Sequence, residues 1–180
     1  MLSSYDIRDV YDSLGMSPAG LGCIMLDADP VPQAAEIPEQ DLYYSKNPEQ
    51  SYIRGAVSLS ESHVTLLYGL LESGPTWRKL VDRVLEGWEI PRALVIDEVT
   101  SFGPVPGEHY SCIVAKIGVT ENLAEGHSRL QLLPHIDTFP YKPHLTLAYV
   151  HENVGEKWEA FFKESLLHTE VAVHGLNYGD

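Results

Sequence analysis

Two stretches of the chain, "SHVTLLYGL" at residues 62–70 and "PHLTLAYVH" at residues 143–151, are near-copies of each other. Each holds a His-x-Thr motif, at residues 63–65 and 144–146, inside an otherwise apolar segment. Large apolar and β-branched residues in such short runs predict a strand for each stretch. The pair raises the question of why a chain with 8 histidines places two of them in matching strands.

The similarity between the two stretches extends beyond the motifs. His63 and His144 are 81 residues apart, and the same offset relates four further pairs. Two copies are too few for a solenoid. We therefore expect one structural unit used twice, with its copies related by a pseudo-two-fold axis. The four further pairs are Thr65 and Thr146, Leu66 and Leu147, Tyr68 and Tyr149, and Trp77 and Trp158.

Strands and helices alternate along the rest of the chain. Runs of β-branched residues predict strands, and apolar residues three and four apart predict helices, with Thr76 and Thr120 as N-caps. A chain of 180 residues with this pattern fits one domain, residues 1–180, of the α+β or mixed α/β class. The expected strands are 21–27, 63–71, 93–103, 109–119, 142–150 and 168–179, and the expected helices are 77–88, 120–136 and 154–167.

One segment, residues 28–60, fits neither pattern. It contains four prolines, which exclude a long helix there. It also contains Tyr43, Tyr44 and Tyr52. We expect a Pro/Tyr-rich insert between the first strand and the first motif.

The composition argues against a long nucleic acid or a membrane as a binding partner. The net charge is −14, from 12 Lys+Arg against 26 Asp+Glu, and no basic stripe for a long RNA or DNA is visible. A local pocket on such a protein can still bind a small anion. No apolar run approaches the ~20 residues that span a bilayer, and "MLSSYDIRDV" at the N-terminus lacks the features of a secretory signal. These observations predict a soluble, cytoplasmic protein without a membrane partner, and they leave its oligomeric state open.

The two cysteines, Cys23 and Cys112, both lie in apolar strand-like runs. Neither belongs to a zinc-binding spacing, and no histidine cluster supplies a third metal ligand. We expect buried, reduced thiols, no metal site and no cofactor.

The motifs suit phosphodiester chemistry if the two strands face each other. Side chains alternate in a strand, so His63 and Thr65 share one face, as do His144 and Thr146. One neutral imidazole can accept a proton from an attacking oxygen while one imidazolium protonates the leaving oxygen. The threonine hydroxyls can donate hydrogen bonds to the non-bridging phosphate oxygens. This arrangement requires no metal.

The doubled motif resembles that of the two-histidine (2H) phosphoesterase superfamily, which includes LigT-like RNA cyclic phosphodiesterases. "YKPHLTLAYV", residues 141–150, is similar to the second motif of that family. The resemblance implies a bilobal α+β fold with two pseudo-symmetric antiparallel sheets, outer helices and a central cleft. It also implies that His63 and His144 are the general acid and base, in an order left open, and that Thr65 and Thr146 bind phosphate.

The acidity and the tyrosine-bearing insert distinguish this chain from relatives that act on RNA ends. Both differences favour a small nucleotide. A bacteriophage branch of the family degrades cyclic oligonucleotide signals of bacterial immunity, and we rank this activity, in the host cytoplasm, ahead of opening 2′,3′-cyclic phosphates on RNA ends or nucleotides. A non-catalytic protein that binds a cyclic nucleotide is the alternative from another class.

Other residues near the motifs are candidates for substrate binding. Lys142 shares a strand face with His144 and is preceded by Tyr141, so both are candidates for contacting the substrate. Aromatic side chains stack on nucleobases, which makes Tyr43, Tyr44 and Tyr52 candidates too, with packing on the domain as the alternative. Tyr68 and Tyr149 lie five residues after each histidine, so regular alternation places them in the core unless a β-bulge turns them.

Overall fold

The computed structural model describes residues 21–136 and 140–179. The expected features of the N-terminal segment lie outside the described residues. Within the described part, six strands and three α-helices follow the predicted order closely. The strands are β1 (Gly22–Ala28), β2 (His63–Leu70), β3 (Ala93–Phe102), β4 (Tyr110–Ile117), β5 (His144–His151) and β6 (Glu170–Gly179); the helices are α2 (Arg78–Val84), α3 (Glu121–Leu130) and α4 (Gly155–Leu166).

The six strands form one antiparallel sheet in the order β1-β2-β5-β4-β3-β6, which closes because β6 pairs with both β3 and β1. The α+β class is therefore confirmed. The expected division into two pseudo-symmetric sheets is not shown by this pairing. Strand β2 meets β5 through one residue pair, Val64 with Leu145, whereas β4 and β5 pair along most of their length. The two motif strands are thus neighbours in the sheet, and they have the fewest paired residues of any neighbouring strands.

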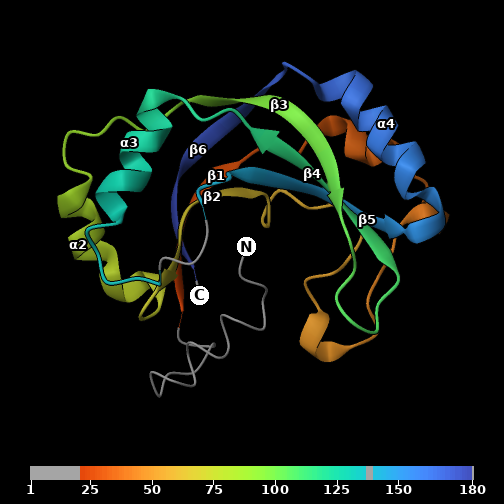
Figure 1. Ribbon diagram of the computed structural model, residues 1–180, viewed down its shortest axis with the longest axis horizontal. Coiled ribbons are helices and arrows are strands. Elements are labelled where there is room, and N and C mark those ends of the chain that lie inside the picture. The colour runs from red at the N-terminus through yellow and green to blue at the C-terminus, as the bar shows by residue number, and fades with distance from the viewer. Residues whose placement is uncertain (1–20, 137–139, 180) are drawn as a thin grey trace.

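An apolar core joins one face of this sheet to the three helices. Val64 and Leu145 are both fully buried, as alternation within the motifs predicts. Helix α4 supplies Trp158 and Phe162 to this core. Helices α2 and α3 lie together at one end of the sheet and α4 lies at the other (Figure 1). The opposite face of the sheet is left for the motif side chains.

The helix starts differ in how well the sequence predicted them. The Thr120 hydroxyl accepts a hydrogen bond from the Leu123 N–H at 3.1 Å, so this N-cap is confirmed. The prediction for Thr76 was wrong. A 3₁₀ turn, Gly74–Trp77, precedes α2, and Trp77 occupies the cap position. Pro75 at the start of this turn fixes the tighter backbone before the helix begins.

The Pro/Tyr-rich insert contains short 3₁₀ turns and no α-helix, as its prolines predicted. It runs along the α4 end of the sheet (orange in Figure 1), where the Trp158 indole donates to Asp41 at 2.8 Å. Ile53 from this insert packs with Cys112 and Val114 in a second, smaller apolar cluster. The insert is therefore part of the folded domain, and it forms β-bridges with β5, of Leu42 with Val150 and of Ala56 with Ala148, where β5 is not paired with β2.

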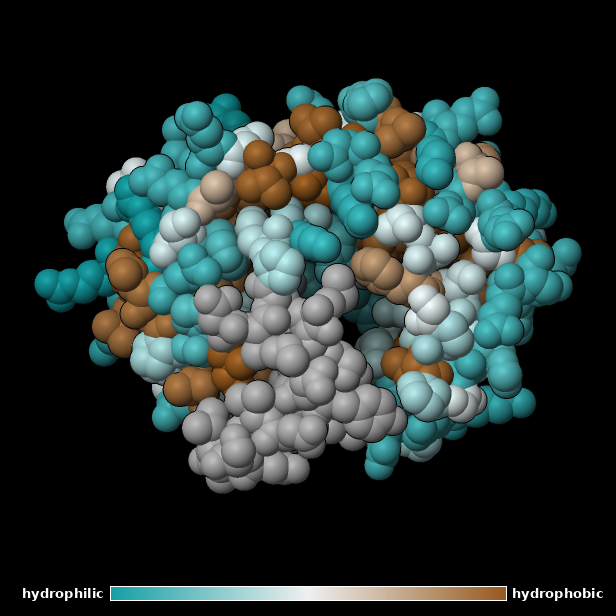
Figure 2. All heavy atoms as spheres, in the orientation of Figure 1, coloured by the Kyte–Doolittle hydropathy of each residue, from teal (hydrophilic) through white to brown (hydrophobic). Residues whose placement is uncertain are grey.

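The surface of the protein is largely hydrophilic, as its high content of acidic residues predicts. Hydrophilic side chains dominate the outline of the face seen in Figure 2. No helix within the described residues is long and apolar enough to cross a membrane.

Both thiols are buried and free, which confirms the cysteine prediction. Burial raises the pKa of Cys23 and of Cys112 to about 11. Because the thiolate is the reactive form, we expect iodoacetamide at about pH 8 to label neither residue appreciably in the native protein. Mass spectrometry after timed labelling measures this, with the urea-unfolded protein as the control in which both thiols react. Rapid labelling of the native protein would contradict the described packing.

Candidate active site

The two His-x-Thr motifs lie next to each other on one face of the sheet. Val64 pairs with Leu145 in an antiparallel ladder. Continuing this register by one residue in each direction places His63 opposite Thr146, and Thr65 opposite His144. Since Val64 and Leu145 both point into the core, their neighbours all point to the other face. The four motif side chains therefore gather on one surface.

The register also limits the separation of the two histidines. Residues directly opposite each other in an antiparallel pair have Cβ atoms about 4.5–5.5 Å apart, and diagonal neighbours lie about 7–8 Å apart. His63 and His144 are diagonal neighbours in this register. A diagonal spacing of this kind suits one phosphate held between two imidazoles.

Both imidazoles are held by the same local hydrogen bond. Nδ1 of His63 lies 2.8 Å from the Glu61 carbonyl oxygen, and Nδ1 of His144 lies 3.1 Å from the Lys142 carbonyl oxygen. In each case the carbonyl belongs to the residue two positions earlier. A carbonyl only accepts, so Nδ1 carries the hydrogen and Nε2 is left to exchange a proton. The geometry suits both rings for acid–base catalysis.

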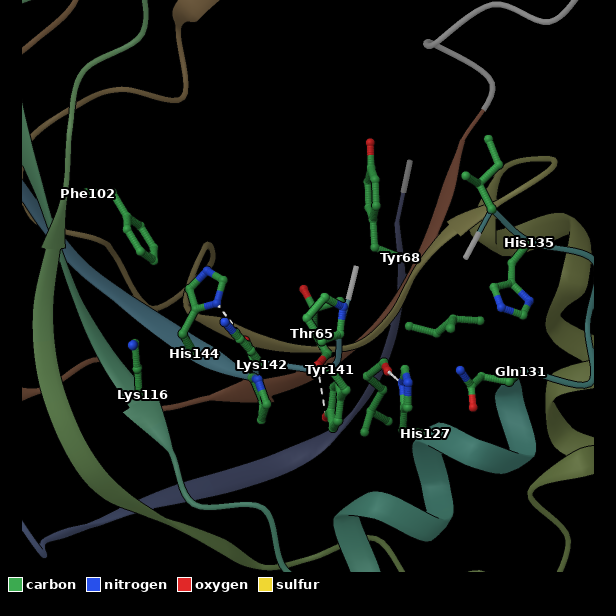
Figure 3. Close-up of a pocket in the computed structure, with 15 residues that line it drawn as sticks. Thr65, Tyr68, Phe102, Lys116, His127, Gln131, His135, Tyr141, Lys142 and His144 are labelled. Atoms are coloured by element: carbon green, nitrogen blue, oxygen red, sulfur yellow. Dashed lines mark hydrogen bonds between the residues drawn. The ribbon is translucent and has the colours of Figure 1, made fainter. Parts of the chain in front are cut away.

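A pocket of about 570 Å³ opens beside Thr65 and His144. This volume lies within the range of small-molecule sites. Figure 3 shows Thr65, Tyr68 and His144 rising from the strands on one side of the sheet, with His127, Gln131 and His135 beyond them. The pocket is lined by Thr65, Leu66, Leu67, Tyr68, Phe102, Lys116, His127, Gln131, His135, Ile136, Pro140, Tyr141, Lys142, Pro143 and His144.

The electrostatics of this pocket oppose those of the whole chain. Two lysines and three histidines are among its described lining residues, and no aspartate or glutamate is, although the net charge is −14. Lys116 pairs with His144 across β4 and β5, and Lys142 lies two residues before His144 in the chain. Lys116 also forms a 3.5 Å ion pair with Glu98, a partly exposed contact of small energetic value. The lysine end of the pocket suits an anion.

Two β-bulges turn tyrosines onto the motif face. The register between β1 and β2 skips Leu66, and that between β4 and β5 skips Leu147, the residue at the same position of the sequence repeat. Tyr68 consequently lines the pocket with its side chain 47% exposed. Tyr149 packs edge-on against Tyr110 at 5.4 Å. The bulge alternative to regular alternation therefore holds for both tyrosines, because each bulge adds one residue to the alternation. Core packing was wrong for Tyr68, whereas Tyr149 packs against the smaller apolar cluster.

Tyr141 and Lys142, the substrate-binding candidates beside the second motif, both line the pocket. Tyr141 donates its hydroxyl hydrogen to the Thr65 carbonyl at 3.2 Å and stacks on His127 at 3.9 Å between ring centroids. Nδ1 of His127 donates to the Leu66 carbonyl at 2.5 Å. Burial raises the pKa of Tyr141, so its hydroxyl stays protonated and able to donate. This stacked pair holds the bulged part of β2 in place.

The three tyrosines of the insert do not line this pocket. Tyr43 donates to the Glu108 carboxylate and packs on the Tyr110 ring at 5.6 Å. The hydrogen bond with Glu108 raises the pKa of Tyr43. Tyr44 and Tyr52 are 44% and 59% exposed. The structure thus separates these tyrosines from Thr65 and His144 and gives Tyr43 a packing role.

His63 and Thr146 are not among the residues that line the pocket. His63 is exposed, while Thr146 is half-buried and pairs with Val114 of β4. The pocket therefore flanks the motif face on the Thr65 and His144 side. Sequence reasoning missed Phe102, whose ring meets that of His144 edge-on at 5.8 Å and restricts its rotation.

Comparison with known proteins identifies the family. A family model described as the 2′-5′ RNA ligase superfamily matches residues 31–176, which include both motifs. The chain belongs to the 2′-5′ RNA ligase superfamily. This is the LigT-like 2H phosphoesterase superfamily, so the resemblance identified from the sequence is confirmed.

Among solved structures, Usb1 from Kluyveromyces marxianus is similar to this chain, with a TM-score of 0.49 and 10% sequence identity, over 88% of this chain and 93% of that one. A search of curated proteins found no match.

Within the described residues, no three His, Cys, Asp or Glu side chains gather in a way that could hold a metal ion.

Proposed function

We propose that this member of the 2′-5′ RNA ligase superfamily is a metal-independent phosphodiesterase acting on small nucleotides, with His63 and His144 as general acid and base. The observation that carries the proposal is the matched anchoring of both imidazoles by the carbonyl two residues earlier. Each ring then presents Nε2 on the same face of the sheet. Thr65 and Thr146 lie between them as donors to the phosphate oxygens.

The chemistry follows from this geometry. For a 3′,5′ linkage, one neutral imidazole accepts the proton of the substrate's 2′-hydroxyl, whose oxygen forms a bond to phosphorus. The bond from phosphorus to the 5′ oxygen breaks, and the other histidine, as imidazolium, protonates that oxygen. The products are a 2′,3′-cyclic phosphate and a 5′-hydroxyl. In ring opening of a 2′,3′-cyclic phosphate, water replaces the 2′-hydroxyl as the nucleophile.

We propose cyclic oligonucleotides as the first substrate class. A pocket on one side of the motifs and an exposed His63 on the other leave room for a nucleoside on each side of the scissile phosphate. The 2′,3′-cyclic phosphates of nucleotides or RNA ends, which need space on one side, are the alternative. No observation bears on a phage source or a role against immunity, so that part of the sequence hypothesis stays a prediction.

The decisive experiment is a product assay in EDTA with cyclic di- and trinucleotides and, separately, 2′,3′-cyclic mononucleotides. We expect full activity without divalent ions, because two imidazoles supply both proton transfers. Chromatography identifies the products. Activity that disappears in EDTA and returns with Mg²⁺ would contradict the mechanism. Binding of nucleotides without turnover by the wild-type protein would instead support a non-catalytic binder.

A further inference from the structure

The pocket extends well beyond the space needed for one phosphate. From Thr65 and His144 it continues along β2 to the end of α3. We name the distal part, lined by Tyr68, His127, Gln131, His135 and Ile136, the α3 arm. The motif chemistry does not use these side chains, so the arm needs another explanation.

One hydrogen-bonding atom of the α3 arm, on His135, has no partner among the residues that the structure describes. Nδ1 of His135 donates to the Leu133 carbonyl at 2.7 Å, which leaves Nε2 as an acceptor in the neutral ring. This Nε2 atom is buried and has no hydrogen-bond partner among the residues that the structure describes. The amide of Gln131, four residues earlier and on the same wall, offers both a donor and an acceptor. Buried polar atoms are normally paired, so an unpaired acceptor on a residue that lines a pocket points to a ligand group that donates.

The arm also offers an aromatic surface. Tyr68 is 47% exposed, and its ring stands up from β2 on the wall of the arm (Figure 3). Aromatic side chains of this kind stack on nucleobases, whatever the base, because every base has a π-face. The same β-bulge that turned Tyr68 out of the core therefore provides a stacking surface in the pocket that His135 also lines.

The distribution of charge separates two kinds of occupant. Lys116 and Lys142 lie at the His144 end, whereas the residues that define the arm include no lysine, arginine, aspartate or glutamate. A second phosphate would be placed against cationic side chains. A flat, uncharged group with N–H donors fits the arm better.

We propose that the α3 arm is a nucleobase subsite for the nucleotide next to the scissile phosphate, and that it favours a base with an exocyclic amino group. Two acceptors, Nε2 of His135 and the amide oxygen of Gln131, receive the amino hydrogens, and the Gln131 amide donates to a ring nitrogen of the base. Tyr68 covers one face. This inference rests on the proposed function, because that function puts the phosphate between the motifs.

The test is a binding measurement that does not depend on turnover. Isothermal titration of the wild-type protein uses 3′-AMP, 3′-CMP and 3′-UMP, with ribose 3-phosphate as the base-free probe. We expect 3′-AMP and 3′-CMP to bind more tightly than 3′-UMP. Gln131→Leu and Tyr68→Ala should each weaken 3′-AMP binding about tenfold and leave ribose 3-phosphate unchanged. Gln131 and Tyr68 are both exposed enough for the variants to fold, which circular dichroism verifies.

Matched controls locate the subsite. Gln40→Leu and Tyr52→Ala change exposed residues that do not line the pocket, and neither should alter binding. Three results would overturn the inference: no binding of any nucleotide by the wild type, equal affinity for nucleotide and base-free probe, or unchanged 3′-AMP affinity in both arm variants. Failure of the proposed function is distinguishable, since it would appear as base-selective binding without turnover of any phosphodiester.

Discussion

Replacing His63 or His144 by alanine is expected to lower kcat/KM for the cleaved phosphodiester by about 10²–10⁴, the usual loss for a general acid or base. Both rings present Nε2 on one face because each Nδ1 is bound to a local carbonyl. Neither ring lies in the main apolar core, so the variants should fold normally. Steady-state kinetics with the substrate identified by the product assay measures the loss.

His109→Ala is the matched control for these variants. Its side chain is 81% exposed and it does not line the pocket. We expect wild-type kinetics from this variant. Unchanged turnover in either motif variant would remove that histidine from the mechanism. The double variant should be little worse than each single one if both histidines act in one concerted step, because residues that act as a unit are not additive.

The second large effect is expected for Thr65→Val and Thr146→Val. Valine keeps the shape of threonine and removes the hydroxyl that donates to a non-bridging phosphate oxygen. Losing one such donor costs about 10² in kcat when negative charge grows on that oxygen in the transition state. KM should change less than kcat, since the hydrogen bond strengthens only as the charge grows.

Thr76→Val, at an exposed position before α2, is the corresponding control and should leave kcat unchanged. A variant of Thr65 or Thr146 whose only defect is a raised KM would indicate uniform binding of phosphate in place of transition-state stabilisation. Thr65 is also 3.8 Å from the Cys23 thiol, so the thermal stability of Thr65→Val has to be compared with the wild type before its kinetics are interpreted.

The strands were predictable because alternation depends on neighbours in the sequence. The faces of His63 and His144, and the burial of Val64 and Leu145 behind them, followed from a period of two. What the sequence left open was which strands pair. Nothing in the two near-copies indicates that their meeting point is the single pair Val64 and Leu145.

The side chains missed by sequence reasoning depend on structure that has no local signal. Tyr68 faces the pocket only because Leu66 is bulged, and no residue type there requires a bulge. His127, Gln131 and His135 have no counterparts in the repeat, so a search for repeated motifs passed over them. Their spacing of four residues fits one face of the helix expected over 120–136, but α3 ends at Leu130 and His135 forms a β-bridge with Leu70, so helical spacing could not have placed all three. The tyrosines of the insert were chosen on composition, which carries no information about position.

The matched anchoring of the two imidazoles has a consequence for the polarity of cleavage. Because both rings are held alike, the catalytic groups do not by themselves distinguish the end of the linkage that departs. The surroundings of the motifs do distinguish the two ends, because the α3 arm adjoins Thr65 and His144 whereas His63 is exposed on the other side. Under the proposed function, the direction in which a nucleotide lies across the motifs decides which oxygen leaves. A relative could reverse its cut through changes in the α3 arm alone, with both His-x-Thr motifs untouched.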